Sequence, residues 1–127
     1  MKNKILFIIL ILIQIFFVNK LFSQEIDIQA ADIEFSKDQN LTIANNATAI
    51  IKKDGIIIKG EKIEYFKDKS FLLIKDGKIS TTAENLEIES DLIEYEIDKS
   101  NLNLKGNVEV KDDINNLVMK SDEINYD

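Results

Sequence analysis

The sequence contains no cysteine, histidine, proline or tryptophan, and only four glycines. Without cysteine, no disulfide can stabilise the fold. Without cysteine and histidine, the commonest nucleophile–base pairs and zinc sites are excluded. The four glycines are isolated from one another, which excludes a glycine-rich phosphate loop. The chain of 127 residues must therefore be stabilised by the burial of apolar side chains, and it is long enough for that.

The charge of the chain is acidic overall and is unevenly distributed. The formal net charge is −7. Residues 1–23 contain three lysines and no acidic residue, so the rest of the chain carries 13 lysines against 23 acidic residues, a net charge of −10. A surface this acidic repels nucleic acids and anionic membranes. We therefore expect neither of them as a primary partner.

The start of the chain has the pattern of an export signal. Two lysines precede an apolar run over residues 5–18, and a small residue, Ser23, follows the run. This order predicts a secretory signal peptide over residues 1–23 and a mature domain over residues 24–127. Leu21 stands where cleavage sites usually have a smaller residue, so an uncleaved membrane anchor is the competing interpretation. The apolar run is, however, shorter than the ~20 residues that a spanning helix needs.

One pattern recurs four times in the predicted mature domain. It ends in an aromatic residue, Phe35, Tyr65, Tyr95 or Tyr126, and these residues are 30, 30 and 31 positions apart. A repeat of this length predicts stacked units that share one continuous core. The columns seven, five and two residues before the aromatic are Ile28, Ile58, Ile88 and Met119, then the small residues Ala30, Gly60, Ser90 and Ser121, then Ile33, Ile63, Ile93 and Ile124.

Each repeat has the periodicity of β-structure. Apolar and polar residues alternate on both sides of the small column, but a three-residue step at that column shifts the alternation by one. A strand that keeps one face toward the core across such a step needs a bulge or a bend, and no helical stripe matches it. Polar turns are predicted at 36–40, 66–70 and 96–101, with a further break inside each unit, as at Asn45-Asn46. Each unit is thus expected to form about three short antiparallel strands.

The carboxylates do not form a catalytic pattern. Most of those beside the apolar columns alternate with core positions, which places them on a solvated face. The cluster at 112–116 lacks the spaced ligands and final Glu of a calcium loop, so a plain turn is expected there. We therefore expect no enzymatic activity, no metal and no cofactor. The carboxylates beside the apolar columns are Asp32, Glu34, Glu61, Glu64, Asp91 and Glu94.

The last part of the chain resembles a known repeat. Residues 102–110 contain a strand with a Gly-Asn-Val step, and residues 119–127 end in a small residue, Asp, and a hydrophobic-x-Tyr-Asp sequence. This pattern resembles the OstA-like repeat of the LptA-like lipopolysaccharide-transport family, which includes periplasmic LptA, anchored LptC and the N-terminal domain of LptD. The resemblance extends over residues 26–127. It implies an all-β, antiparallel β-jellyroll, a folded-over and open-ended sheet whose apolar interior carries lipid A acyl chains across the periplasm.

The resemblance also implies partners and binding residues. Open sheet edges join jellyrolls of this family end to end, so the implied partners are lipopolysaccharide, other jellyroll proteins of the transport bridge and further copies of the chain, at the inner or outer membrane. The fourth copy of the recurring pattern, at the end of the given sequence, has no following strand to pair with and is the expected interacting edge, through Met119, Ser121, Ile124 and Tyr126. The implied groove residues are Ile28, Ile33, Phe35, Ile58, Ile63, Tyr65, Ile88, Ile93, Tyr95, Leu104 and Val108.

Three functional interpretations stay open at this point. The first is a lipid-binding bridge protein, and the second is the N-terminal periplasmic portion of LptD, in which case the sequence would continue beyond Asp127. The third, of another class, is a structural module of stacked strands with a dry core and no lipid. A groove leaves apolar side chains exposed as a patch, whereas a dry core does not.

Overall fold

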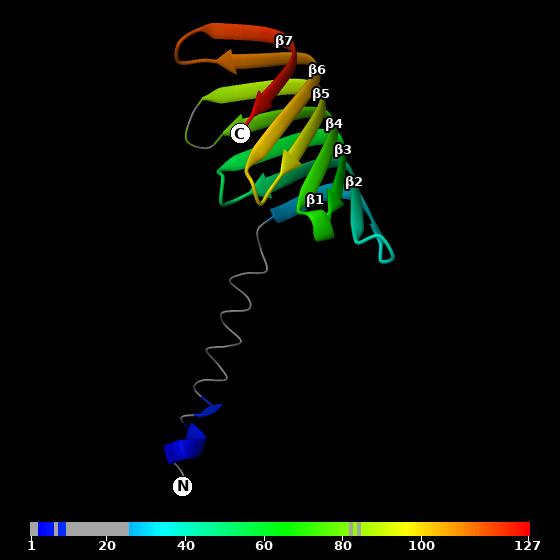
Figure 1. Cartoon of the computed structure of the whole chain (residues 1–127), viewed down its shortest axis with the longest axis vertical. Coiled ribbons are helices and arrows are strands. Elements are labelled where there is room, and N and C mark those ends of the chain that lie inside the picture. The colour runs from blue at the N-terminus through cyan, green and yellow to red at the C-terminus, as the bar shows by residue number, and fades with distance from the viewer. Residues whose placement is uncertain (1–2, 7, 10–25, 82, 84) are drawn as a thin grey trace.

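The chain forms one antiparallel sheet in which each strand pairs with the next one along the sequence (Figure 1). The computed structural model describes residues 3–6, 8–9, 26–81, 83 and 85–127. Within these residues the sheet has seven strands, and a short 3₁₀-helix joins the third to the fourth. The elements are β1 (Ile26–Ser36), β2 (Leu41–Ile51), β3 (Ile56–Phe66), η1 (Lys67–Lys69), β4 (Phe71–Thr81), β5 (Leu86–Glu96), β6 (Asn101–Asp112) and β7 (Leu117–Tyr126).

The predicted signal peptide or anchor lies mostly outside the described residues. Residues 3–6 and 8–9 are helical. No helix in the described part of the chain is long and apolar enough to cross a membrane. The signal peptide over residues 1–23 therefore stays a prediction, with an uncleaved membrane anchor as its alternative.

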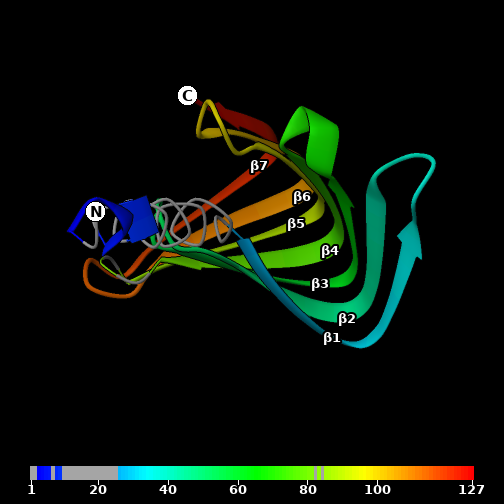
Figure 2. The same ribbon diagram turned by 90° about the horizontal axis from the view of Figure 1, so that it is seen from below.

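Every strand bends near its middle, so the sheet folds over on itself. Figure 2, seen from below, shows the V-shaped section that results. The bend passes through the small column of the repeat, where the pairing of β1 with β2 skips one residue on each strand between Ala30↔Ala47 and Asp32↔Asn45. The prediction of an all-β antiparallel jellyroll is confirmed.

The prediction of three short strands per repeat is wrong, because each repeat contributes two long ones. The break predicted at Asn45-Asn46 lies inside β2, which continues over 11 residues. Asn46 has a positive φ of 47°, and Asp76 has a φ of 49° at the same place in β4. Asn and Asp tolerate these left-handed angles, which turn the strand through the bend without removing it from the ladder. The signal that predicted a turn therefore marks the bend itself.

The inner side of the bend has no room for larger residues. A Cβ at Gly60 would stand 2.4 Å from Ile74 Cγ2, and a Cβ at Gly77 would stand 2.5 Å from Ile93 Cδ1. Both distances are well inside the ~3.5–4.0 Å of normal carbon contacts. Crowding at the bend therefore explains both glycines, as the sequence predicted for the small column that contains Gly60.

The last repeat is one residue longer than the others, with 31 positions between Tyr95 and Tyr126. The extra residue lies in β6, which has 12 residues. Gly106 and Asn107 both have a positive φ, 83° and 47°, and the register with β7 shifts between Lys105 and Val108. These features define a β-bulge. The hydroxyl of Ser90, in the small column of β5, donates to the carbonyl oxygen of Lys105 at 3.0 Å. The small column thus supplies a hydrogen bond where the bulge displaces the backbone.

Two rows of turns lie at the two ends of the strands. The predicted polar turns form one row, at 37–40, 67–70 and 97–100. Backbone hydrogen bonds connect neighbouring turns of this row, as where the N–H of Ile97 donates to the carbonyl of Ser70 at 2.8 Å. The other row includes the turn at 52–55, at the opposite ends of the strands. The fold brings the two rows toward each other across the mouth of the V (Figure 2).

The inner face is sealed in the middle of the stack and becomes exposed toward its edges. Ile58, Ile63 and Ile93 have no exposed surface. By contrast, Phe35 on β1 is 75% exposed and Tyr126 on β7 is 68% exposed. The middle of the interior is therefore a packed core, and the ends are accessible.

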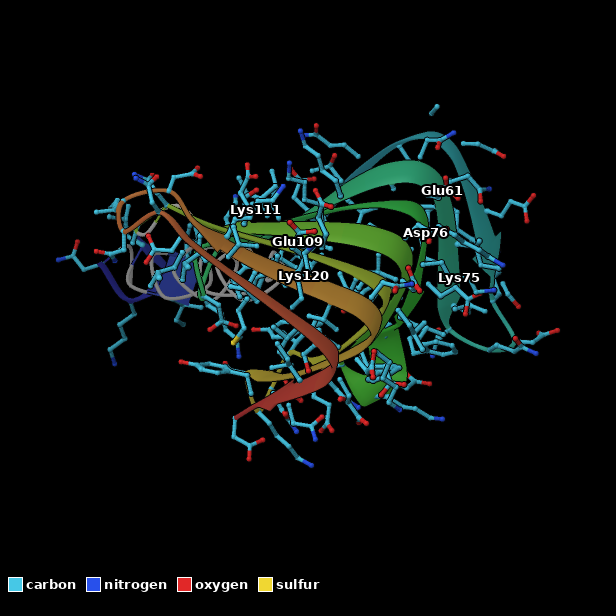
Figure 3. All side chains as sticks on the ribbon, turned by 90° about the horizontal axis from the view of Figure 1, so that it is seen from above. Glu61, Lys75, Asp76, Glu109, Lys111 and Lys120 are labelled. Atoms are coloured by element: carbon cyan, nitrogen blue, oxygen red, sulfur yellow. The ribbon has the colours of Figure 1, made fainter. Side chains whose placement is uncertain are left out.

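The outer face carries charged side chains (Figure 3). Glu61 of β3 and Asp76 of β4 lie at the bend, on neighbouring strands. On the outer face of β6, Lys111 Nζ lies 3.6 Å from a carboxylate oxygen of Glu109, and Lys120 of β7 is the cross-strand partner of Glu109. The sheet is thus apolar on its concave side and charged on its convex side.

Candidate binding site

A cavity of about 450 Å³ lies inside the fold between β3 and β7. This volume falls within the ~300–1,000 Å³ that is typical of ligand sites, which are also mainly apolar. Three polar residues, Asp54, Thr81 and Ser100, contribute to its wall. The remaining lining residues are Ile56, Ile79, Leu86, Ile88, Tyr95, Leu102, Leu104, Val110, Met119, Ile124 and Tyr126.

The strands β6 and β7 form one wall of this cavity. Leu104 pairs with Ile124, and Val110 pairs with Met119, so apolar side chains stand opposite each other on both sides of the bulge. Met119 is 53% exposed although it lines the cavity, and Tyr126 is also exposed. The cavity is therefore open at the β7 edge of the sheet.

Two of these polar residues, Asp54 and Ser100, form a hydrogen-bonded cluster with the hydroxyl of Tyr95 at the cavity wall, and we call this cluster the clasp. The hydroxyls of Tyr95 and Ser100 both donate to the carboxylate of Asp54, the second at 3.1 Å. Asp54 lies in the turn between β2 and β3, whereas Ser100 lies in the other row of turns. The clasp therefore joins the two arms of the folded sheet across the mouth of the V.

The electrostatics of the clasp favour its hydrogen bonds. Tyr95 is only 1% exposed. Burial, followed by the hydrogen bond to Asp54, raises the pKa of the Tyr95 hydroxyl above its ordinary value. The hydroxyl therefore keeps its proton at neutral pH and acts as a donor to the carboxylate.

A second cavity of about 750 Å³ lies at the β1 end of the fold. Its wall includes Phe35 and Tyr65, together with polar side chains from the row of turns, among them Lys37 and Lys67. This wall is mixed in character, whereas the first cavity is mainly apolar. We call the two the β1-end cavity and the apolar cavity.

The predicted groove residues divide into three groups. Ile88, Tyr95 and Leu104 line the apolar cavity, and Phe35 and Tyr65 line the β1-end cavity. The others lie in the packed core or against it, except Ile33, which is exposed on the edge strand β1. These others are Ile28, Ile33, Ile58, Ile63, Ile93 and Val108.

The predicted edge residues lie on β7, which is an edge strand of the described sheet. Met119, Ile124 and Tyr126 also line the apolar cavity, so edge and cavity share these side chains. Ser121 lies at the bend, where its hydroxyl donates to the carbonyl of Glu123 at 2.9 Å. That these residues bind a lipid or a partner stays a prediction.

Sequence reasoning missed two kinds of cavity residue. Ile79, Leu102 and Val110 share the inward alternation of predicted residues on their own or neighbouring strands, so the same period-2 argument could have included them. The clasp members Asp54 and Ser100 carry no such signal. They are 46 positions apart and meet only because the sheet folds over.

Some of the acidic side chains form local hydrogen bonds at the surface. Asp91 accepts a hydrogen bond from the side-chain amide of Asn107 at 2.9 Å. Asp112 accepts hydrogen bonds from the side chain and backbone of Asn115 and from the backbone of Ile114, and these lower its pKa. Such local bonds are typical of a turn, as predicted for 112–116. In the part of the chain that the structure describes, no group of three or more acidic, Cys or His residues could hold a metal ion.

Comparison with known proteins finds a match in structure and none in sequence. No protein-family model matches the sequence, and no curated protein matches it. A solved structure that does match is LptH, the LptA homologous periplasmic component of the lipopolysaccharide transport device from Pseudomonas aeruginosa. The match has a TM-score of 0.71 and 14% sequence identity, and it covers 82% of this chain and 76% of that chain. The chain therefore has the LptA-like fold that the resemblance of its repeat predicted.

Proposed function

We propose that this chain is a non-catalytic, periplasmic lipid-binding module of lipopolysaccharide transport, and that the apolar cavity holds an acyl chain of the lipid. The observation that carries the proposal is the apolar cavity itself, which has a ligand-sized volume and opens at the β7 edge. The fold supports it, because LptH has the same fold and is a component of the lipopolysaccharide transport device. The predicted signal at residues 1–23 supports export to the periplasm.

A photo-crosslinking experiment tests the proposal. Benzoylphenylalanine at Tyr126 replaces one aromatic side chain with another at the open side of the cavity. The same probe at Asn125 is the matched control, since successive side chains of a strand point to opposite faces. With lipopolysaccharide as the probe ligand, we expect strong crosslinking from position 126 and little from position 125. Equal labelling from both positions would contradict a lipid site on the concave face.

We further propose that the β7 edge joins other jellyroll modules or further copies of the chain. An exposed edge strand presents unpaired backbone groups that another strand can extend. Asn125→Pro removes one N–H, whereas Asn125→Thr keeps it and serves as the control. We expect the proline variant to associate less, as measured by analytical ultracentrifugation, with an unchanged circular dichroism spectrum. Identical association of the two variants would exclude this edge as the junction.

A structural role without lipid is the second candidate, and the sealed middle of the interior favours it. Ile58, Ile63 and Ile93 were implied groove residues and have no exposed surface. This candidate predicts that no lipid co-purifies with the exported protein, which mass spectrometry of an organic extract measures. If lipopolysaccharide co-purifies with the wild type, and less of it co-purifies with the cavity-wall variant Met119→Asp, the structural role without lipid is rejected. The choice between a bridge protein and the front part of an LptD protein depends on the gene sequence that follows Asp127.

A further inference from the structure

The turn at 97–100 lies between the two cavities. Asp98 lines the β1-end cavity, and Ser100, two residues later, lines the apolar cavity. Ile97, at the start of the turn, is 1% exposed and packs in the core. The turn is held from both sides, by the backbone bond from Ile97 to Ser70 and by the hydroxyl bond from Ser100 to Asp54. It therefore forms a partition between the two cavities, with Asp98 and Lys99 exposed on its outer side.

The clasp completes this partition on the side of the apolar cavity. Asp54, Tyr95 and Ser100 all contribute to the wall of that cavity, and none of them lines the β1-end cavity. The carboxylate of Asp54 accepts from both hydroxyls, so its polar surface is directed into the clasp. An alkyl chain that passed this point would have to separate the carboxylate from its donors without replacing their hydrogen bonds, which is unfavourable.

We propose that Asp54, Tyr95 and Ser100 determine the length of acyl chain that the apolar cavity accepts, by closing it off from the β1-end cavity. This inference rests on the proposed function. A chain that enters at the open β7 edge gains affinity with each methylene that it buries, until its end reaches the clasp. Further methylenes then stay outside the cavity and add little. Without the clasp, the chain extends toward the β1-end cavity, whose volume of about 750 Å³ exceeds that of the apolar cavity.

The test measures affinity against chain length. Lysophosphatidylcholines from octanoyl to stearoyl, which carry no net charge, compete with a fluorescent apolar dye for the purified protein, at concentrations below their micelle-forming range. For the wild type we expect the affinity to rise by about fourfold for each buried methylene and then to level off at an intermediate length. Asp54→Ala removes the acceptor of both hydroxyls and should move the plateau to longer chains. Lys53→Ala, an exposed neighbour in the same turn, is the matched control and should leave the plateau in place.

Tyr95→Phe provides a second variant that preserves the core, because it removes the hydroxyl and keeps the ring. We expect it to move the plateau in the same direction by a smaller amount. If the wild type binds and all folded variants reach the plateau at the same chain length, the inference is overturned and the proposed function stands. The same holds if the affinity of the wild type rises with chain length without a plateau. Failure of the wild type to bind any chain would overturn both.

Discussion

The substitution Gly60→Ala tests whether the bend is a packed contact between strands. The new Cβ would stand 2.4 Å from Ile74 Cγ2 and 3.3 Å from the backbone oxygen of Lys75. Overpacking of this kind typically costs ~1–3 kcal/mol. Alanine also restricts the unfolded chain, which offsets about 0.4–1 kcal/mol of that cost. We therefore expect Gly60→Ala to lower the free energy of unfolding by about 1–2 kcal/mol.

The surrounding residues explain why this strand needs glycine. Ala30 occupies the same column on β1, an edge strand that has a neighbour on one side only. On β3, by contrast, the side chain of Ile74 from β4 fills the space beside the bend. The clash is therefore with one identified methyl group, so it can be relieved by removing that group.

Urea unfolding of a double-mutant cycle with Ile74→Ala measures this relief. The Ile74→Ala substitution alone removes a fully buried side chain and should cost ~2–5 kcal/mol. In the double variant the methyl group introduced at position 60 occupies part of the space that Ile74 leaves. The total cost should then be smaller than the sum of the single costs, by an amount comparable to the cost of Gly60→Ala itself. Additive costs would refute a direct clash between these two positions at the bend.

Two further predictions concern hydroxyl groups. Ser90→Ala removes the donor to the displaced carbonyl of Lys105 at a position that is 5% exposed, so urea unfolding should show a loss of about 1–3 kcal/mol. Ser121→Ala, in the same column on the edge strand β7, should change stability by less than about 0.5 kcal/mol, and equal losses would contradict the role of burial. Because the pKa of Tyr95 is raised in the folded protein, its contribution to stability is complete below the unfolded value of about 10 and is lost as the pH rises above it, by up to about 1.4 kcal/mol per pH unit. Thermal unfolding across alkaline pH should therefore show a steeper decline in the wild type than in Tyr95→Phe, and parallel declines would show that this hydroxyl is not a buried donor.

The repeat made most of the fold predictable, because each column of the alignment became a row of neighbouring side chains in the sheet. The strand count failed for a local reason. Asn46 and Asp76 have the backbone angles of turn residues, and a sequence does not distinguish a turn that reverses the chain from a bend that continues it. Only the pairing of β2 with both β1 and β3 on each side of Asn46 shows that the strand continues.

The site was less predictable than the fold, because it depends on how far apart the two arms lie. Ile58 and Ile88 occupy the same column of the repeat, yet the first is fully buried and the second lines the apolar cavity. Alternation identifies which side chains point inward, but not where the space between the arms is filled. That depends on contacts such as Ser100 with Asp54, which connect distant turns and have no periodic signature.

The repeat also fixes a unit of length. Neighbouring strands lie about 4.8 Å apart, so each 30-residue unit of two strands lengthens the sheet by roughly 10 Å. The six strand-to-strand spacings between β1 and β7 place these two strands about 29 Å from each other. A unit carries its own bend and its own turns, and it bonds to the next through its backbone. Duplicating or deleting one unit in the gene would therefore lengthen or shorten the protein in whole steps while leaving its cross-section unchanged. The length of such a protein therefore depends on its number of repeats and can change without a redesign of its core.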